Sequence, residues 1–205
     1  MTYTVKEAVK KVKENATEKF DASVEAHINL KVPENQTVRF TTTLPEGTGK
    51  ERKVAVMSSE DVPEADLQLK EADIAKIKKG ELSPGEDFDV FIAEPRFMSK
   101  IAQVAPILGP AGVMPNPKSG TVTENVQNTV KDFKSGQIEV RTEPSATIIH
   151  TVIGKVSWDD ERLASNLNHL LTALRSNRPV GAKQNWIKSV YVTSSMGPSF
   201  EVSLE

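Results

Sequence analysis

The chain has 205 residues, enough for one large domain or two small ones, and its 38% hydrophobic and 26% charged residues are typical of a globular protein with a buried core. It contains no cysteine, which excludes disulfides, thiolate catalysis and thiolate metal sites and fits a reducing compartment. The formal net charge of −2 argues against a generic nucleic-acid binder with an overall basic field, so any nucleic acid must be bound through a local surface.

The first part of the chain predicts one helix and two strands. Thr4 followed by Glu7 matches a capping box, and a helical apolar face follows it. Strict alternation over 22–30 predicts a half-buried strand, and 37–43 predicts a second strand before a turn-rich break at 44–50. The apolar residues of the predicted helix are Val5, Ala8, Val9, Val12 and Ala16, and those of the first strand are Val24, Ala26, Ile28 and Leu30.

The middle of the chain is predicted to form a small α/β layer. Nearly continuous apolar runs at 53–58 and 88–93 predict strands buried on both faces. Only seven residues separate the first run from a candidate strand at 66–69, so parallel pairing there would mean that a crossover helix is missing. Helices are predicted at 71–80, 94–108 and 124–136, the last with Val126, Val130 and Phe133 on one face.

A run of three prolines and three glycines occupies residues 107–123. Proline fixes φ and glycine permits positive φ, so much of this backbone is predetermined. We interpret the segment as a rigid elbow leading into the helix at 124–135, and not as a catalytic lid or a nucleotide loop.

The alternating pattern returns after residue 137. Strands are predicted at 137–142 and 146–153, then a helix at 158–177, then a closing hairpin around the turn "SMGP". The helix carries a stripe of Leu163, Leu167, Leu170, Leu171 and Leu174. The two outer segments both show the alternating strand pattern, which the middle segment lacks. We therefore predict one discontinuous domain from 1–47 and 137–205, with 48–136 inserted.

Catalytic and cofactor signals are weak. "GTGK" at 47–50 lacks the other residues of a phosphate-binding loop, and no dinucleotide fingerprint follows a strand. His27, His150 and His169 lie on different predicted elements without ligand spacing, and we interpret them as isolated surface or core residues. We therefore predict no catalytic residue, metal or cofactor. The apolar runs are too short for a bilayer and the N-terminus has no apolar leader, so we expect a cytoplasmic protein.

The final hairpin, "SVYVTSSMGPS" at 189–199, is the strongest binding candidate. Ser189, Tyr191, Thr193 and Ser195 alternate onto one strand face, and a methionine and a glycine follow at the turn. Hydroxyls beside a flexible apolar side chain suit recognition of ribose edges and stacked bases. A polar strand face and an ordinary turn is the alternative interpretation.

Five blocks of sequence, in order, resemble the bacterial form of the L-one family of large-subunit ribosomal proteins. They are "KFDASVEAHINL", "TTTLPEGTGK", "ILGPAGVMPNPKSGTVT", "IIHTVIGKVSW" and "VYVTSSMGPS". The resemblance runs from about residue 5 to residue 203. It implies an α/β protein of two domains: a discontinuous split α+β two-layer domain from both chain ends, and an inserted, trimmed Rossmann-like three-layer α/β domain.

The family resemblance also implies function. Members bind a stalk of large-subunit ribosomal RNA near the exit site for deacylated tRNA, and many repress translation by binding their own messenger RNA. The implied partners are thus the ribosome and its RNA, with the own messenger RNA and the exit-site tRNA as further candidates. We expect a monomer when free, and no membrane partner. A nucleotide- or small-molecule-binding α/β enzyme using the inserted domain is the alternative, and so is a relative that has left the ribosome.

Carried over residue by residue, the resemblance implies an RNA-contacting surface. Its members are Phe20, Glu25, Ser189, Ser195, Met196 and Gly197, with Lys19 and Arg39 as flanking phosphate contacts and Lys118 as a candidate contact of the inserted domain. The chain departs from the family at Ala111, where an arginine is usual, and at Ser195, where threonine is common. The short connection at 59–65 is a third departure and implies a trimmed insert.

Overall fold

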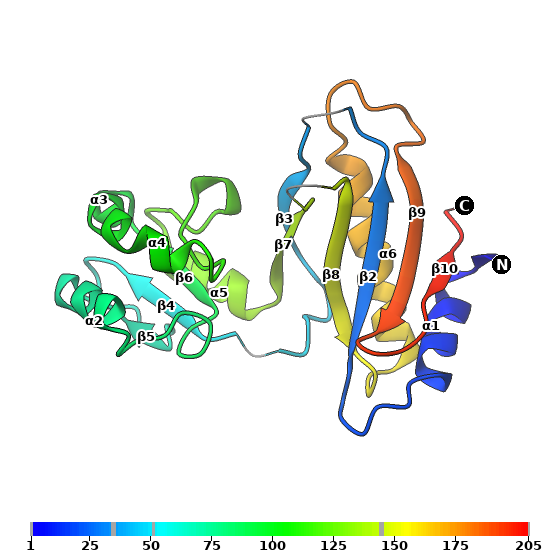
Figure 1. The fold of residues 1–205 in the computed structure, drawn as a ribbon, viewed down its shortest axis with the longest axis horizontal. Helices are drawn as coiled ribbons and strands as arrows, with labels where there is room; N and C mark the ends of the chain where they lie inside the picture. The colour runs from blue at the N-terminus through cyan, green and yellow to red at the C-terminus, as the bar shows by residue number, and fades with distance from the viewer. Residues whose placement is uncertain (1, 34–35, 51, 144–145, 205) are drawn as a thin grey trace. The chain divides into compact units, whose positions relative to one another are not determined.

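The computed structural model describes residues 2–33, 36–50, 52–143 and 146–204. It is a mixed α/β protein whose chain divides into two compact units (Figure 1). The first unit comprises Met1–Lys50 and Gly136–Glu205, and the second comprises Glu51–Ser135. Residues 48–50 belong with the first unit because Gly49 lies against Trp158: a Cβ built on this glycine would be 2.8 Å from the indole ring.

A five-stranded sheet organises the first unit, in the order β1-β10-β9-β2-β8. Its strands are β1 (Thr2–Tyr3), β10 (Phe200–Val202), β9 (Ile187–Ser194), β2 (Ser23–Leu30) and β8 (Ile148–Lys155). The hairpin of β9 and β10 is antiparallel, as predicted, and only β1 and β10 pair in parallel. Strand β2 lies at the centre and pairs with β8 on one side and with β9 on the other.

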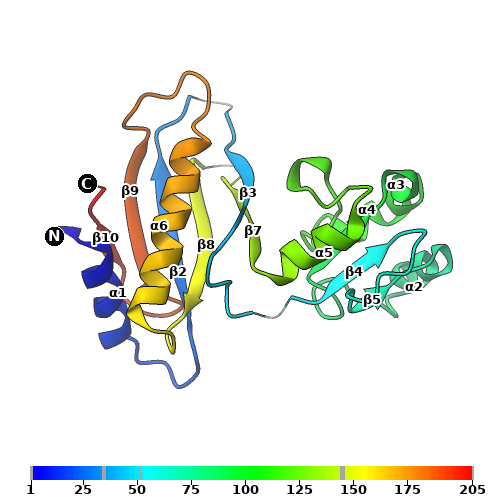
Figure 2. The same cartoon turned by 180° about the vertical axis from the view of Figure 1, so that it is seen from behind.

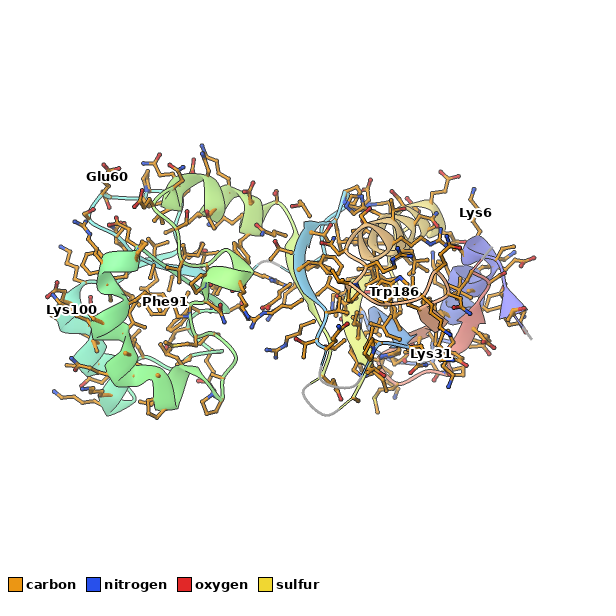
Figure 3. All side chains as sticks on the ribbon, turned by 90° about the horizontal axis from the view of Figure 1, so that it is seen from above. Lys6, Lys31, Glu60, Phe91, Lys100 and Trp186 are labelled. Atoms are coloured by element: carbon orange, nitrogen blue, oxygen red, sulfur yellow. The ribbon has the colours of Figure 1, made fainter. Side chains whose placement is uncertain are left out.

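Two helices, α1 (Val5–Glu14) and α6 (Asp160–Ser176), pack on the sheet and on each other. The predicted capping box is confirmed: the backbone N–H of Thr4 donates to Glu7 Oε2 (2.9 Å), and Thr4 Oγ1 accepts from the backbone N–H of Glu7 (3.4 Å). The predicted leucine stripe of α6 is buried throughout, as is Trp186. Figure 2 shows α6 lying along the sheet, and Figure 3 labels Trp186 among the side chains of the first unit. Burial alternates along β2, so one face of the sheet meets the helices and the other is half-exposed, as the sequence predicted.

A two-stranded sheet of β3 (Arg39–Thr43) and β7 (Gln137–Arg141) completes the first unit. Its link to α6 is a buried polar residue, Asn166, which lies within the apolar stripe. The Asn166 side-chain amide donates to the carbonyls of Gly47 and Ile153, both at 2.8 Å, and its oxygen accepts from the N–H of Glu46 at 3.0 Å. All polar atoms of this side chain are thereby satisfied, as burial requires.

The second unit contains a parallel sheet in the order β5-β4-β6, formed by β5 (Leu67–Gln68), β4 (Val54–Met57) and β6 (Val90–Ala93). Every residue of β4 and β6 is buried, as their apolar runs predicted. Strands β4 and β5 pair in parallel although the connection between them, residues 58–66, contains no helix. The predicted loss of a crossover helix is therefore confirmed.

Helices cover both faces of this sheet. Alternate strand residues enter two separate apolar clusters, one of them including Ile77, Phe91 and Ile101, the other Val126, Val130 and Phe133. The helical elements are η1 (Glu71–Asp73), α2 (Ile74–Lys79), η2 (Pro95–Phe97), α3 (Met98–Ile101), η3 (Ala102–Val104), α4 (Ala105–Leu108), η4 (Pro117–Ser119) and α5 (Val126–Lys134).

The helix predicted over 94–108 is wrong as a continuous element. The structure divides it into short α and 3-10 turns, with Pro106 inside the first turn of α4. Proline lacks the N–H that an interior helical position needs and restricts the residue before it, so the ladder of helical hydrogen bonds is interrupted here.

None of the helices in the described part of the chain combines the length and the apolar character needed to cross a membrane.

The predicted elbow is held by local hydrogen bonds. Asn116 Oδ1 accepts from the N–H of Lys118 (2.8 Å), and Thr121 Oγ1 accepts from the N–H of Asn116 (2.8 Å). The segment then runs beside β6, where the N–H of Ala93 donates to the Thr121 carbonyl (2.9 Å). These bonds fix the backbone just before α5, as the proline and glycine pattern indicated.

Candidate nucleic-acid interface

The candidate surface is built at one end of the five-stranded sheet, where residues 15–22 meet the turn at 195–199. Three hydrogen bonds connect the end of β9 and this turn to residues 15–22 and to the start of β2. The N–H of Ser195 donates to the carbonyl of Ser23 (3.1 Å), while the N–H of Met196 (3.2 Å) and the hydroxyl of Ser194 (2.8 Å) both donate to Glu18 Oε1. Two segments far apart in the sequence therefore form one backbone platform, which we call the loop–turn platform (residues 15–22 and 195–199).

Large apolar side chains protrude from this platform. Phe20 is 58% exposed and Met196 is 79% exposed. Among the described residues, the exposed large hydrophobic side chains are Phe20, Ile107, Val180 and Met196. Phe20 and Met196 project from segments that hydrogen bonds hold together, which is the arrangement expected of a contact surface and not of scattered surface residues.

Polar groups of the predicted site lie beside these apolar ones. The Ser195 hydroxyl is 3.4 Å from the Ser23 carbonyl and 3.5 Å from Glu25 Oε1, and it can donate to either. Lys19 is exposed on the platform. Lys155, which the sequence did not single out, donates from Nζ to Ser23 Oγ (3.0 Å) and supplies a second cation near this end of the sheet.

Gly197 has a steric role in the turn. A Cβ added there would lie 2.2 Å from Ser194 Oγ, the hydroxyl that binds Glu18. We expect Gly197→Ala to displace the Ser194 side chain, to lower the melting temperature by a few degrees and to weaken RNA binding. Thermal unfolding and an RNA titration measure both effects. Ser199→Ala, in the same turn, is the control for the melting temperature, and an unchanged Gly197→Ala protein would contradict the steric role.

Glu18 is the residue that the sequence analysis missed, because only the folded chain brings it to the turn. The pKa of its carboxyl is lowered, first by its own backbone N–H and next by the Ser194 hydroxyl, with the Met196 N–H contributing. Folding therefore favours the ionised form. The ionised Glu18 carboxylate therefore stabilises the turn fully above the ordinary carboxyl pKa. This stabilisation is lost as the pH falls through the lowered pKa of Glu18.

Replacing Glu18 with alanine should loosen the turn, because it removes the acceptor of both Ser194 and Met196. The expected result is faster amide hydrogen exchange at Met196 and weaker RNA binding. Glu14→Ala, an exposed carboxylate at the end of α1, serves as the matched control. Unchanged exchange at Met196 in Glu18→Ala would show that the turn holds its shape without Glu18.

Glu25 lies on β2 at the edge of the loop–turn platform, within 3.5 Å of the Ser195 hydroxyl, and three further predicted site residues lie outside the platform. Ser189 pairs with Asn29 near the other end of β9, and its hydroxyl accepts from Asn29 Nδ2 (2.9 Å). Ser195 comes six positions later along the chain, a distance of about 20 Å. Arg39 lies on β3, paired with the carboxylate of Glu139. Lys118 is exposed in the second unit.

One residue of the predicted polar face of β9, Thr193, is buried and not available to a ligand. Ser189, Tyr191 and Thr193 are the register partners of Asn29, His27 and Glu25, so they do share the half-exposed face. The Thr193 side chain is nevertheless buried, with its hydroxyl 2.9 Å from the carbonyls of both Ser194 and Gly197. It braces the turn and is not a free donor for a ligand.

The interpretation of the histidines as isolated is wrong for two of them. His27 and His150 face each other across the β2–β8 pair, with 2.5 Å between their Nδ1 atoms. Antiparallel pairing of strands 123 residues apart creates this contact, which no local spacing could reveal. His169 Nε2 instead lies 3.1 Å from Thr42 Oγ1. Within the described ranges, no group of three or more His, Cys, Asp or Glu residues is arranged to hold a metal.

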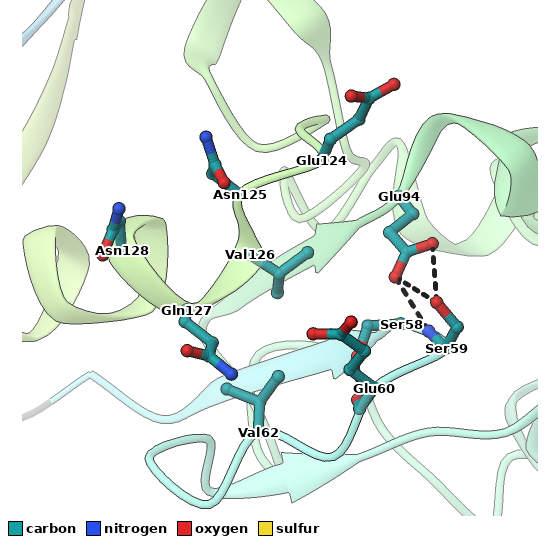
Figure 4. A pocket seen from close by; sticks show the side chains of 10 residues that line it. All are labelled: Ser58, Ser59, Glu60, Val62, Glu94, Glu124, Asn125, Val126, Gln127 and Asn128. Carbon is teal, nitrogen blue, oxygen red and sulfur yellow. Dashed lines mark hydrogen bonds between the residues drawn. The ribbon is translucent and has the colours of Figure 1, made fainter.

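A pocket of about 360 Å³ lies in the second unit, beyond the carboxyl ends of β4 and β6 (Figure 4). It is lined by Ser58, Ser59, Glu60, Val62, Glu94, Glu124, Asn125, Val126, Gln127 and Asn128. Burial acts to raise the pKa of Glu94, but hydrogen bonds from Ser59 and the neighbouring Arg96 outweigh it, so the pKa is lowered. With three carboxylates and no cation among its lining residues, the pocket is unsuited to a nucleotide phosphate.

Comparison with known proteins gives one consistent result. The family model "Ribosomal protein L1p/L10e family" matches residues 12–198. The large ribosomal subunit protein uL1 of Prochlorococcus marinus strain NATL1A is 42% identical over 212 residues, covering 99% of this chain and 88% of that protein. The uL1 proteins of strains MIT 9312 and MIT 9301 are each 43% identical over 211 residues, covering 98% of this chain and 88% of their own length.

Proposed function

Because the chain belongs to the L1 family of ribosomal proteins, and is thus a structural, non-enzymatic protein of the large subunit, we propose that it binds the ribosomal RNA stalk near the tRNA exit site. The first unit makes the contact through the loop–turn platform. The observation that carries this proposal is the pair of exposed side chains, Phe20 and Met196, on two segments that hydrogen bonds join. Membership of this non-enzymatic family argues against the alternative of a nucleotide- or small-molecule-binding enzyme.

The chemistry of the platform explains how an acidic protein binds RNA. Ribose hydroxyls and base edges can be recognised by Ser hydroxyls, backbone groups and carboxylates, while bases stack on apolar side chains. Glu25 and Ser195 supply an acceptor and a hydroxyl beside Met196. Lys19 and Lys155 place positive charge at the same end, so phosphates meet local cations despite the net charge of −2.

We assign the two units to the two domains of the family. The first unit is then the discontinuous RNA-binding domain, and the second is a trimmed Rossmann-like domain. The helical cover on both faces of the parallel sheet supports the second assignment, and the helix-free connection between β4 and β5 supports the trimming. Lys118 of the second unit is a candidate RNA contact.

The same platform accounts for the further partners. A messenger RNA that folds like the stalk presents the same ribose and base edges, so binding to its own message would repress translation. The stalk's position also brings the exit-site tRNA within reach as a neighbour. Both roles place the protein on cytoplasmic ribosomes, and we expect it to be monomeric when free.

A titration of the purified protein with a transcribed ribosomal RNA stalk fragment tests the proposal. We expect tight binding with a shallow dependence on salt, because few phosphates are neutralised. A duplex of equal length without the stalk's loops and bulges is the control RNA and should bind weakly. Equal affinity for both RNAs, or a steep salt dependence shared by both, would contradict recognition through an uncharged platform.

A further inference from the structure

The half-exposed face of the first sheet carries a close histidine pair at its centre. The imidazoles of His27 on β2 and His150 on β8 lie edge to face, with ring centroids 4.8 Å apart, and their Nδ1 atoms are separated by 2.5 Å. Two nitrogen lone pairs cannot approach so closely, so a proton lies between them. One ring is therefore the donor and the other the acceptor.

Carboxylates occupy the outer side of both rings. Glu25 Oε2 lies 3.8 Å from His27 Nε2, and Glu143 Oε1 lies 3.5 Å from His150 Nε2. In a neutral pair, one of the two Nε2 atoms bears a lone pair that faces a carboxylate. Adding one proton to the pair gives every Nε2 a hydrogen, and each then points at an acceptor. The row Glu25–His27–His150–Glu143 is thus arranged to hold one extra proton.

A second extra proton is disfavoured in the free protein. The pKa of His27 is lowered, first by burial and then by the charge of His150, while Glu25 acts in the opposite direction. The other side chain facing His27 across the sheet is Tyr191, its register partner on β9. A negative group placed over the pair would stabilise its positive charge and so favour the singly protonated pair, in which both Nε2 atoms carry a hydrogen.

The pair lies on the strand face between two predicted RNA contacts, Glu25 and Ser189. Glu25 is two residues before His27 on the same strand, and Ser189 pairs with Asn29, two residues after it. The family resemblance predicts both Glu25 and Ser189 as RNA contacts, and an RNA chain that reaches the two of them must cross the sheet face between them. That crossing passes over His27 and Tyr191, next to His150.

We propose that the His27–His150 pair is a proton-binding element of the RNA surface, which contacts phosphate and makes RNA affinity rise as the pH falls from about 8 to about 6. This inference rests on the proposed function and adds its regulation. Phosphate favours the protonated pair, so RNA binding takes up protons. By linkage, a complex that binds more protons than its free components becomes more stable at lower pH.

The first experiment is a titration with the ribosomal RNA stalk fragment at pH about 8 and about 6, in the presence of a chelator. We expect wild-type protein to bind about threefold to fivefold more tightly at the lower pH, as one additional exposed ion pair would give. The double variant His27→Gln/His150→Gln should bind with nearly equal affinity at both. His169→Gln is the matched control and should keep the full pH dependence, since this residue lies on α6 and contacts Thr42.

Met196→Ala separates this inference from the function beneath it. If Met196→Ala loses binding at both pH values while wild type shows no pH dependence, the RNA surface stands and the histidine proposal is overturned. A double variant that keeps the wild-type pH ratio also overturns it, since other groups would then carry the effect. Absence of wild-type binding at either pH removes both claims together.

A second measurement needs no variant and so avoids any effect on folding. Calorimetric titration of wild-type protein with the stalk fragment at pH about 7, in two buffers of different ionisation enthalpy, gives the number of protons taken up. We expect uptake of a fraction of one proton up to about one proton per complex. Proton release, or heats that are equal in both buffers, would overturn the proposal.

Discussion

Replacing Leu170 with alanine should lower the free energy of unfolding of the first unit by about 2–5 kcal/mol, the range for a buried leucine whose removal leaves a cavity. Leu170 is fully buried in the stripe of α6 and belongs to the core cluster beneath the five-stranded sheet. Close-packed interiors collapse only partly around a deleted side chain, so lost contacts and lost burial add together.

Tryptophan fluorescence can follow this change in the first unit alone. The chain has two tryptophans, Trp158 and Trp186, and both belong to that unit. Urea unfolding should therefore show a lower midpoint for Leu170→Ala without interference from the second unit. Val180→Ala is the matched control, because Val180 is 92% exposed and its truncation should change stability by less than about 0.5 kcal/mol. Equal midpoints for the two variants would mean that α6 does not face the core as described.

Elements whose signals are local were predictable from the sequence. The capping box at Thr4, the alternation along β2 and the leucine stripe of α6 each follow from a period of two or 3.6 residues. In each case the residues that specify the element are its own neighbours in the chain. Pro106 is a local signal for a break as well, but the continuous apolar pattern over 94–108 conceals it in the sequence.

Features made by pairing distant strands were not predictable in this way. His27 meets His150, and Glu18 meets Ser194, only because β2 lies between β8 and β9. Neither contact leaves a spacing signal in the sequence. The strand order is set by the whole core, so the groups that it brings together become visible only in the fold.

In the candidate site, too, some features could be predicted from the sequence and others are visible only in the fold. Family resemblance selected Phe20, Glu25, Ser195, Met196 and Gly197, and the structure places them at one end of the sheet. Resemblance carries positions but not partners. It therefore could not indicate that Glu18 holds the turn, or that the cation of Arg39 is already paired with a carboxylate.

Met196→Ala should weaken binding to the stalk fragment by about tenfold to a hundredfold, as expected when an exposed apolar side chain that the complex buries is truncated. Met196 is 79% exposed in the free protein, so its removal leaves no cavity and the melting temperature should stay unchanged. Val180→Ala again provides the control. Val180 is as apolar and more exposed, but it lies in the connection between α6 and β9, and its loss should leave RNA affinity unaltered.

Phe20→Ala decides whether the platform acts as one surface. A base stacked on this ring is worth about 1–3 kcal/mol, so the single variant should lose a comparable factor in affinity. Glu18 joins the two segments, so Phe20 and Met196 should contact the same part of the RNA, and the loss in the double variant should fall short of the sum of the two single losses. Fully additive losses would instead indicate two separate contacts. Platform geometry would then matter less for affinity than the exposed side chains themselves.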